Sequence, residues 1–494
     1  PQHVYEVAAD GTGRPRNLTP GEFAYGSVSW LPDASGVVTS GRGHDTWDTD
    51  LAEDLYLVPL DPDGEIRALT HRTGQFAAPA VSPDGTQVAC IGTDNQLEYP
   101  QNMKIGLVPL GPDGGEHRWI STGLDRTFFA MACPQGPVWE TDETLFAVAE
   151  DRGATHLYRL HVDGRDPEPL TEGPITVQGF DHAGGRLATI RSTVRHGGEL
   201  FVAGDGEAQQ VTHVTELRRD WEKFAAPCAD GSDEIDAWIM RPDGFDPEAS
   251  YPVLLNVHGG PFTQYGEYFF DEAQMQAAAG FVVLMSNPRG GSGRHTAWGQ
   301  AIIGPKHPTA PGLGWGTVDV DDVMSVLDHA LERFPFCDRE RVGMLGGSYG
   351  GYMATTLAAR YGDRFRGVCS ERAVNNMLTE EWSADIATFF RVEHGPNPVD
   401  DPDEYLRMSP ITMARDIHVP MLIVHSEEDY RCPINQAEEL WVTLRLLGRD
   451  VTFYRFPGEH HELSRSGSPV HRRMRAELIL DWFAERLERD GPAA

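Results

Sequence analysis

A hairpin signature recurs about every 50 residues through residues 1–215. Each copy has a short apolar run, an Asp-Gly pair and a second short run that ends in Leu-Thr or a close variant. Asp-Gly between two strand-like runs is a strong signal for a tight β-turn. A period of this length is typical of a β-propeller blade, whereas a β-sandwich would match it only by chance. The pairs are Asp10-Gly11, Asp63-Gly64, Asp113-Gly114, Asp163-Gly164 and Asp205-Gly206.

Further strand-like runs lie between these hairpins, for example residues 30–33 and 80–91. They indicate some four blades and a partial one, and few closed propellers have so few. The chain also begins Pro1-Gln2-His3, without Met. We therefore expect residues 1–215 to be an incomplete all-β propeller whose N-terminal part is missing.

The pattern changes near residue 216, after which strand-like runs alternate with helical stretches, as in a parallel sheet. A chain of 494 residues is too long for one ordinary core, so two or more domains are expected. We predict a central strand at 252–257, another strand at 281–285, later strands at 421–424 and 451–454, and a helix from about Pro433 to Gly448. Residues 216–494 are thus predicted to form an α/β domain.

Ser348 lies between an apolar run, 342–345, and an Ala/Leu-rich run, 353–360. The sequence Gly346-Gly347-Ser348-Tyr349-Gly350 therefore predicts a sharp strand-to-helix turn. Such a corner exposes a serine hydroxyl to a histidine base, and Gly346 and Gly350 leave room for the neighbouring backbone. Ser348 is the candidate nucleophile.

His258-Gly259-Gly260-Pro261 directly follows the predicted strand 252–257. A loop of this kind supplies a backbone N–H, assigned to Gly260, opposite the N–H of Tyr349, and the two would form an oxyanion hole. His258 is interpreted as a residue that braces the loop.

Two later strands end in acid and base candidates. Asp429 competes with Glu427 and Glu428, and its place in the loop beyond the strand favours it. His460 and His461 are adjacent, so periodicity cannot separate them. The order Ser348, Asp429, His461 is the nucleophile–acid–base order of α/β-hydrolases.

Composition excludes several function classes. The net charge of −34 argues against nucleic acid or an anionic membrane as partner. No apolar stretch is long enough for a transmembrane helix. The six cysteines lack metal-ligand spacing and are interpreted as reduced and structural. The glycine-rich stretch 290–293 lacks the Lys-Ser/Thr of a P-loop and is interpreted as a loop near the site.

Taken together, these motifs resemble the prolyl oligopeptidase family of serine peptidases, and most closely its acylaminoacyl-peptidase-like branch. The matching stretches are 258–261, 287–290, 346–352, 425–433 and 459–467. The resemblance implies a propeller that caps an α/β-hydrolase peptidase domain. It also implies that His461 is the catalytic histidine and that Arg431 anchors a substrate carbonyl or terminal carboxylate.

From these observations we expect a serine peptidase that cleaves short peptides through an acyl-enzyme, as an exopeptidase or oligopeptidase gated by the propeller. Val374 and Met377 are candidate apolar walls of the substrate pocket. Glu380-Glu381 is interpreted as a solvated helix face rather than a site for a free N-terminal amine. No cofactor or metal is expected.

The alternatives are carboxypeptidase-type trimming, a carboxylesterase and an inactive propeller interaction protein. The expected partners are short peptide substrates, without nucleic acid or membrane; a homo-oligomer stays open. The expected location is cytoplasmic.

Overall fold

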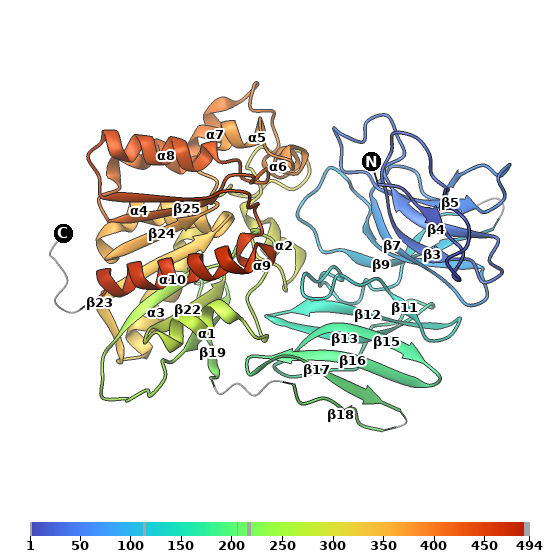
Figure 1. Ribbon diagram of the computed structural model, residues 1–494, viewed down its shortest axis with the longest axis horizontal. Coiled ribbons are helices and arrows are strands. Elements are labelled where there is room, and N and C mark those ends of the chain that lie inside the picture. Colours follow the sequence, from blue (N-terminus) through green and yellow to red (C-terminus); the bar gives the residue numbers. More distant parts are fainter. Residues whose placement is uncertain (1, 112–114, 205, 215–218, 489–494) are drawn as a thin grey trace. The chain divides into compact units, whose positions relative to one another are not determined.

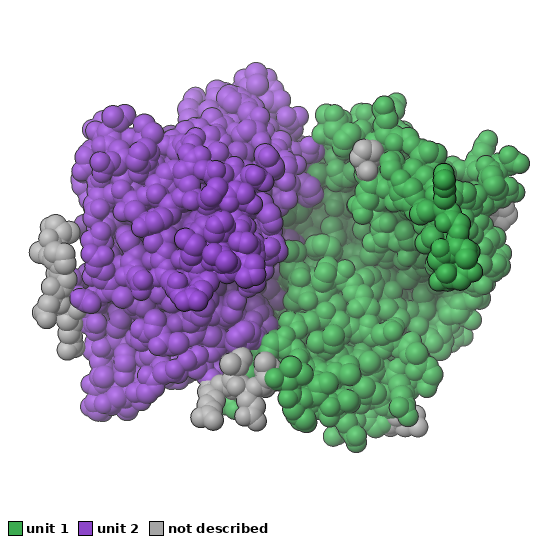
Figure 2. Space-filling model, in the orientation of Figure 1, with its two compact units in different colours: residues 1–216, 293–296 green, residues 217–292, 297–494 purple. Residues whose placement is uncertain are grey.

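The computed structural model describes residues 2–111, 115–204, 206–214 and 219–488. The chain divides into two compact units (Figure 2). Unit 1 contains residues 1–216 together with Gly293–Thr296, and unit 2 contains residues 217–292 and 297–494. The tetrapeptide Gly293–Thr296 is therefore part of unit 1, although the predicted boundary at 215/216 places it in the second domain.

Unit 1 consists of small antiparallel sheets (Figure 1). Strands β3–β6 and β7–β10 form two four-stranded sheets, and β1 pairs with β2. Strands β11–β14 and β15–β18 form two further four-stranded groups, which a single parallel pair, Thr155 with Thr176, joins into one eight-stranded sheet. The strands are β1 (Tyr5–Glu6), β2 (Arg16–Asn17), β3 (Tyr25–Trp30), β4 (Gly36–Gly41), β5 (Asp54–Pro59), β6 (Arg67–Ala68), β7 (Gln75–Val81), β8 (Gln87–Thr93), β9 (Lys104–Pro109), β10 (Arg118–Trp119), β11 (Val138–Trp139), β12 (Thr144–Asp151), β13 (Ala154–His161), β14 (Glu168–Pro169), β15 (Thr176–Ala183), β16 (Arg186–Thr193), β17 (His196–Ala203) and β18 (Gln209–Gln210).

The predicted hairpins are confirmed, because each Asp-Gly pair falls between two strands that pair antiparallel. Asp113-Gly114 and Asp205 themselves lie outside the described residues. The side-chain hydroxyl of the Thr or Ser that follows the Leu, Ile or Val at each hairpin's end explains why this ending recurs. It accepts a hydrogen bond from a backbone N–H of the hairpin's first strand or its approach, at 2.9–3.1 Å, in all five copies: Thr19 from Val4, Thr70 from Leu55, Ser121 from Ile105, Thr171 from Leu157 and Thr212 from Leu200.

Unit 2 is built on one eight-stranded sheet of order β19-β20-β22-β21-β23-β24-β25-β26. Strands β19, β20 and β22 pair antiparallel, and all the later pairs are parallel. The predicted α/β class is therefore confirmed. The strands are β19 (Trp221–Pro227), β20 (Glu234–Met240), β21 (Tyr251–Val257), β22 (Val282–Asn287), β23 (Cys337–Gly347), β24 (Gly367–Glu371), β25 (Met421–Ser426) and β26 (Val451–Phe456).

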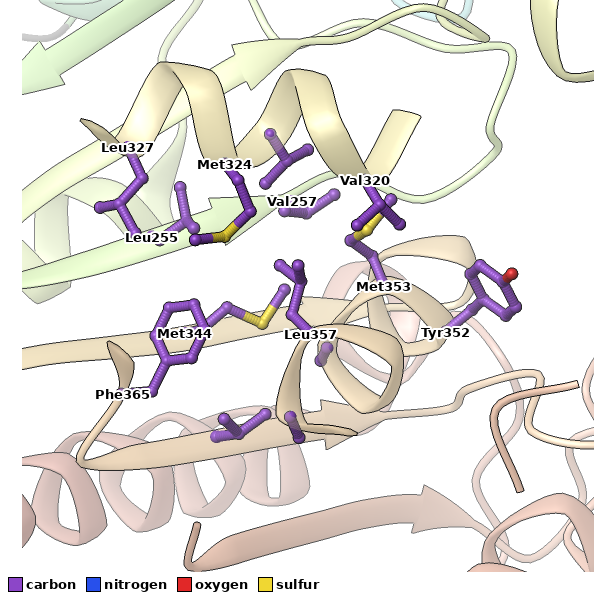
Figure 3. Close-up of a cluster of buried hydrophobic side chains, with 14 of the residues drawn as sticks. Leu255, Val257, Val320, Met324, Leu327, Met344, Tyr352, Met353, Leu357 and Phe365 are labelled. Atoms are coloured by element: carbon purple, nitrogen blue, oxygen red, sulfur yellow. The ribbon is translucent and has the colours of Figure 1, made fainter. Parts of the chain in front are cut away.

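Helices cover both faces of this sheet, so its central strands alternate between two cores. Leu255 and Met344 face the larger core, where α3 and α4 pack side by side against the strands (Figure 3). Leu254 and Leu345 face the smaller core under α10. The helices are α1 (Asp271–Ala278), α2 (Thr296–Gly299), α3 (Val318–Arg333), α4 (Tyr349–Tyr361), α5 (Met377–Glu381), α6 (Ala387–His394), α7 (Pro402–Met408), α8 (Asn435–Leu446), α9 (Leu463–Ser466) and α10 (Pro469–Arg486), with short 3-10 helices η1 (Gln300–Ile302), η2 (Gly362–Arg364) and η3 (Pro410–Asp416).

The predicted helix between Pro433 and Gly448 is α8. All six cysteines are buried and free. Among the described residues, no helix combines the length and apolar character needed to cross a membrane.

Candidate active site

Ser348 occupies the corner between β23 and α4, as its motif predicts. Its backbone has φ 61° and ψ −123°, a left-handed conformation that a non-glycine residue adopts only under local constraint. The Ser348 N–H donates to the Glu371 carbonyl at 3.1 Å, which ties the corner to the end of β24.

The glycines around Ser348 are required by close backbone approach. A Cβ on Gly350 would lie 2.1 Å from the Val257 carbonyl oxygen, and one on Gly346 would lie 2.5 Å from the Gly350 oxygen. Neither position has room for a side chain. The predicted reason for these two glycines is therefore confirmed.

The loop after β21 packs directly against the nucleophile corner. A Cβ on Gly259 would lie 3.3 Å from the Ser348 Cβ. His258 Nδ1 lies 2.7 Å from the Gly259 carbonyl and 3.2 Å from the Thr263 hydroxyl, and burial lowers the pKa of His258 to about 4. His258 is thus a neutral, buried residue whose contacts lie within its own loop.

The backbone N–H groups predicted for the oxyanion hole, those of Gly260 and Tyr349, lie in this loop and at the first residue of α4. The first N–H groups of a helix have no partner within the helix and are free to bind an anion. The Tyr349 side chain serves a different purpose, because its hydroxyl donates to buried Asp319 at 2.6 Å.

Asp429 and His461 form a buried hydrogen-bonded pair beyond the ends of β25 and β26. His461 Nδ1 lies 2.8 Å from Asp429 Oδ2, and the other Asp429 oxygen accepts the N–H groups of Arg431 and Cys432, each at 2.9 Å. His460, in contrast, has Nδ1 at 3.0 Å from the N–H of Glu462 and is exposed. Asp429 and His461 are thus hydrogen-bonded to each other, as a catalytic acid and base would be, and their assignment stays a prediction.

The electrostatics of the pair leave His461 neutral near pH 7. Burial lowers the pKa of His461, and the hydrogen bond and charge of Asp429 oppose this shift only in part. Burial alone would raise the pKa of Asp429, but its hydrogen bond with His461 and the charge of His461 lower it. A carboxylate on Nδ1–H leaves Nε2 as the basic atom of His461.

Cys432 connects the nucleophile to the acid, and sequence reasoning missed it. Its N–H donates to Asp429, and the Ser348 hydroxyl is within hydrogen-bonding reach of its thiol. Burial, followed by the charges of Glu380 and Asp429, raises the pKa of this thiol well above its ordinary value. Cys432 is therefore an uncharged neighbour of Ser348. Its position beside the serine left no signal in the sequence spacing.

The predicted substrate residues have different surroundings. Arg431 is half-buried, and its Nε lies 2.7 Å from Asp385 Oδ1, so an ion pair holds its guanidinium. Val374 and Met377 are each 1% exposed and belong to the larger core of unit 2. Their role as walls of a pocket stays a prediction.

The interpretation of Glu380-Glu381 as a solvated helix face is wrong. Glu380 is fully buried and Glu381 is 4% exposed. Glu381 accepts the Tyr405 hydroxyl at 2.5 Å and Arg391 Nε at 3.3 Å. A helix of five residues is too short to show the periodicity that would have revealed this burial.

A buried ion cluster lies beneath the corner. Arg475 from α10 binds both carboxylate oxygens of Glu371, at 2.5 and 2.6 Å, and Glu272 from α1 at 3.0 Å. Since the Glu371 carbonyl accepts the Ser348 N–H, this cluster fixes the backbone that holds the serine. The three residues are far apart in the sequence, which gave no signal for them.

Among the described residues, no group of His, Cys, Asp and Glu has the arrangement of a metal site. A cavity of about 190 Å³ lies within unit 1, lined by residues that include Glu53 and Phe128. None of its lining residues belongs to the Ser348 site.

The chain resembles known peptidases in sequence. Residues 267–490 match the prolyl oligopeptidase family (Peptidase_S9). The uncharacterised peptidase YuxL of Bacillus subtilis is 31% identical over 72% of this chain and 54% of its own length. Dipeptidyl-peptidase 5 of Aspergillus fumigatus is 24% identical over 82% of this chain and 58% of its own length. The chain thus spans little more than half the length of these relatives.

Solved structures extend the similarity to nearly the whole chain. The acylaminoacyl peptidase of Pyrococcus horikoshii matches 98% of this chain and 74% of its own, with 26% identity and a TM-score of 0.82. An acylaminoacyl peptidase in complex with Z-Gly-Gly-Phe-chloromethyl ketone matches 95% of this chain and 71% of its own, with 27% identity and a TM-score of 0.80. The predicted combination of a β-propeller and an α/β-hydrolase domain is confirmed.

Proposed function

Because residues 267–490 belong to the prolyl oligopeptidase family, we propose that the chain is a serine peptidase that hydrolyses short peptides through an acyl-enzyme. One observation carries the proposal: the buried Asp429–His461 pair follows the parallel strands β25 and β26, and Ser348 follows β23 of the same sheet, so all three residues lie at one edge. Such a set serves acyl transfer in unrelated folds.

In the proposed reaction, Ser348 attacks the carbonyl carbon of the scissile bond while His461 Nε2 takes the serine proton. Asp429 holds the imidazole through Nδ1–H and stabilises its protonated form. The N–H groups of Gly260 and Tyr349 bind the oxyanion. His461 then protonates the leaving amine, and water hydrolyses the acyl-enzyme by the same proton relay in reverse.

Substrate binding is proposed to use Arg431, Val374 and Met377. The ion pair with Asp385 orients the Arg431 guanidinium before a substrate arrives, which lowers the entropic cost of binding a carbonyl or terminal carboxylate. Val374 and Met377 would form the apolar wall closest to the core.

The similarity to acylaminoacyl peptidases favours an exopeptidase or oligopeptidase gated by the propeller. Carboxypeptidase-type trimming and carboxylesterase activity use the same three residues and are the rivals to be separated by experiment. An inactive interaction protein is disfavoured by the formed Asp429–His461 pair. A cytoplasmic location and activity without a cofactor complete the proposal.

Hydrolysis of a matched substrate panel tests this proposal. The panel contains N-acetyl-aminoacyl anilides, free-amine dipeptidyl anilides, peptides with free or amidated C-termini and p-nitrophenyl esters. Ser348→Ala should lower kcat by a factor on the order of 10⁶ while the fold is retained. A fluorophosphonate probe that fails to label Ser348, together with no turnover of any substrate, would refute the proposal. Cleavage of esters alone would favour a carboxylesterase.

A further inference from the structure

Glu380 is a buried carboxyl group without a normal partner. Its side chain is fully buried, and neither carboxylate oxygen has a hydrogen-bond partner of normal geometry among the described residues. The Cys432 thiol, a weak donor, is the side chain that interacts with this carboxyl. Its neighbour Glu381 has two partners, Tyr405 and Arg391. Because an unpartnered buried carboxyl is costly to the fold, its presence calls for a partner that arrives from outside.

Contacts place Glu380 close to the nucleophile. After burial, the charge of Glu380 is the largest cause of the raised pKa of the Cys432 thiol. The Ser348 hydroxyl is within hydrogen-bonding reach of the same thiol. The titratable and charged groups that face Glu380 are Asp429, the Cys432 thiol, Asp385 and Arg431. Arg431 is already bound to Asp385, so two carboxylates and one compensated cation surround Glu380. This environment favours an additional positive charge.

We propose that Glu380 is a specificity-determining residue that binds the basic side chain of Lys or Arg in the residue whose carbonyl Ser348 attacks. The inference rests on the proposed function. A long basic side chain branches from the α-carbon next to the attacked carbonyl. Its cationic end lies several ångströms further on, beyond the groups that touch Ser348. The Ser348 hydroxyl and the Glu380 carboxyl both interact with the Cys432 thiol, so the carboxyl lies near the point of attack.

The charge state of Glu380 gives the inference a second readout. Burial, then the charge of Asp429, raises the pKa of Glu380 well above its ordinary value, so the site favours the protonated carboxyl more than water does. Binding of a guanidinium ionises the carboxyl and releases one proton to solvent. The kcat/KM for an arginine substrate should therefore rise with pH more steeply than that for a neutral substrate.

The experiment compares acetyl-arginine anilide with acetyl-citrulline anilide, which has nearly the same shape and no charge. The enzymes are the unchanged chain, Glu380→Gln and the matched control Glu381→Gln. We expect the unchanged chain to prefer arginine by roughly 10- to 100-fold in kcat/KM, as for hydrogen bonds between charged groups. Glu380→Gln should bring this ratio close to one, and Glu381→Gln should retain it.

Fluorophosphonate labelling of Ser348 shows in each variant whether the site is still formed. Protection of Ser348 from the probe by butylguanidinium, but not by butylurea, tests the same preference without turnover. An arginine-to-citrulline ratio near one in the unchanged chain, or an unchanged ratio in Glu380→Gln, would overturn the inference while Ser348 still reacts. Loss of a preference for unblocked substrates in Glu380→Gln would assign the carboxyl to a free α-amine and overturn it as well. Absence of both labelling and turnover in the unchanged chain would instead refute the proposed function, and this inference with it.

Discussion

Replacement of Gly350 by alanine tests whether close contact between β21 and the nucleophile corner sets the activity. The added Cβ would lie 2.1 Å from the Val257 carbonyl oxygen and 3.0 Å from the His258 oxygen, both of which are backbone atoms. Ordinary contact begins near 3.4 Å, so the two segments must separate by more than 1 Å. The loop that carries Gly260 would then move away from Ser348.

This displacement should lower both the stability and the catalytic rate. Overpacking of a well-packed interior costs about 1–3 kcal/mol, and a misplacement of about 1 Å in a catalytic site costs on the order of 10²-fold in rate. For a unit of this size, the loss of stability corresponds to a melting temperature lower by about 5 °C. Activity should therefore fall much more than stability.

Gly362→Ala is the matched control, since Gly362 ends the same helix in a right-handed conformation. There an added Cβ meets only Val419 and its backbone, at 3.7–4.0 Å, so stability should be equal or slightly higher. The assay combines calorimetry with kcat/KM for the best substrate of the panel. If Gly350→Ala were as active and as stable as Gly362→Ala, the argument from close approach would be refuted.

Two further predictions concern the charged groups of unit 2. Because burial lowers the pKa of His461, the acid limb of the kcat/KM profile should have its midpoint below pH 6.5, the ordinary histidine value. Asp429→Asn removes the interactions that raise this pKa, so the midpoint should move to lower pH. The same substitution should lower kcat by about 10⁴-fold. A pH profile from 4 to 9 checks this, and an upward shift in the variant would contradict it. Arg475→Met should destabilise the fold by about 3–5 kcal/mol, because it leaves buried Glu371 and partly buried Glu272 without their cation. Arg473→Met on the same helix removes only an exposed pair and should leave the stability almost unchanged. Denaturant unfolding measures both, and equal costs would contradict the assigned role of burial.

Local chemistry explains what could be predicted from the sequence. The Asp-Gly hairpins and the Ser348 corner depend on residues that are adjacent in the chain, and turn residues act over two to four positions. The order of Ser348, Asp429 and His461 could be predicted because each follows a strand in the parallel part of one sheet, where the carboxyl ends of the strands share an edge.

Contacts between distant residues explain what could not be predicted. Arg431 pairs with Asp385, and Arg475 pairs with Glu371 and Glu272, across separations that no periodicity links. The assignment of Gly293–Thr296 to unit 1 depends on partners such as Asp125, which accepts hydrogen bonds from Thr296. The burial of Glu380 depends on how α5 is packed, which its five residues do not encode locally.

The contact of Cys432 with Ser348 has a practical consequence for inhibitor profiling. A mercurial or maleimide bound to this thiol would fill the space next to the serine and abolish turnover, although the thiol takes no part in the proposed chemistry. Since the raised thiol pKa keeps the reactive thiolate scarce, such inactivation would be slow at neutral pH and faster in alkaline buffer. Sensitivity to thiol reagents is therefore no evidence for a cysteine peptidase here, and reducing agent belongs in every assay of this chain.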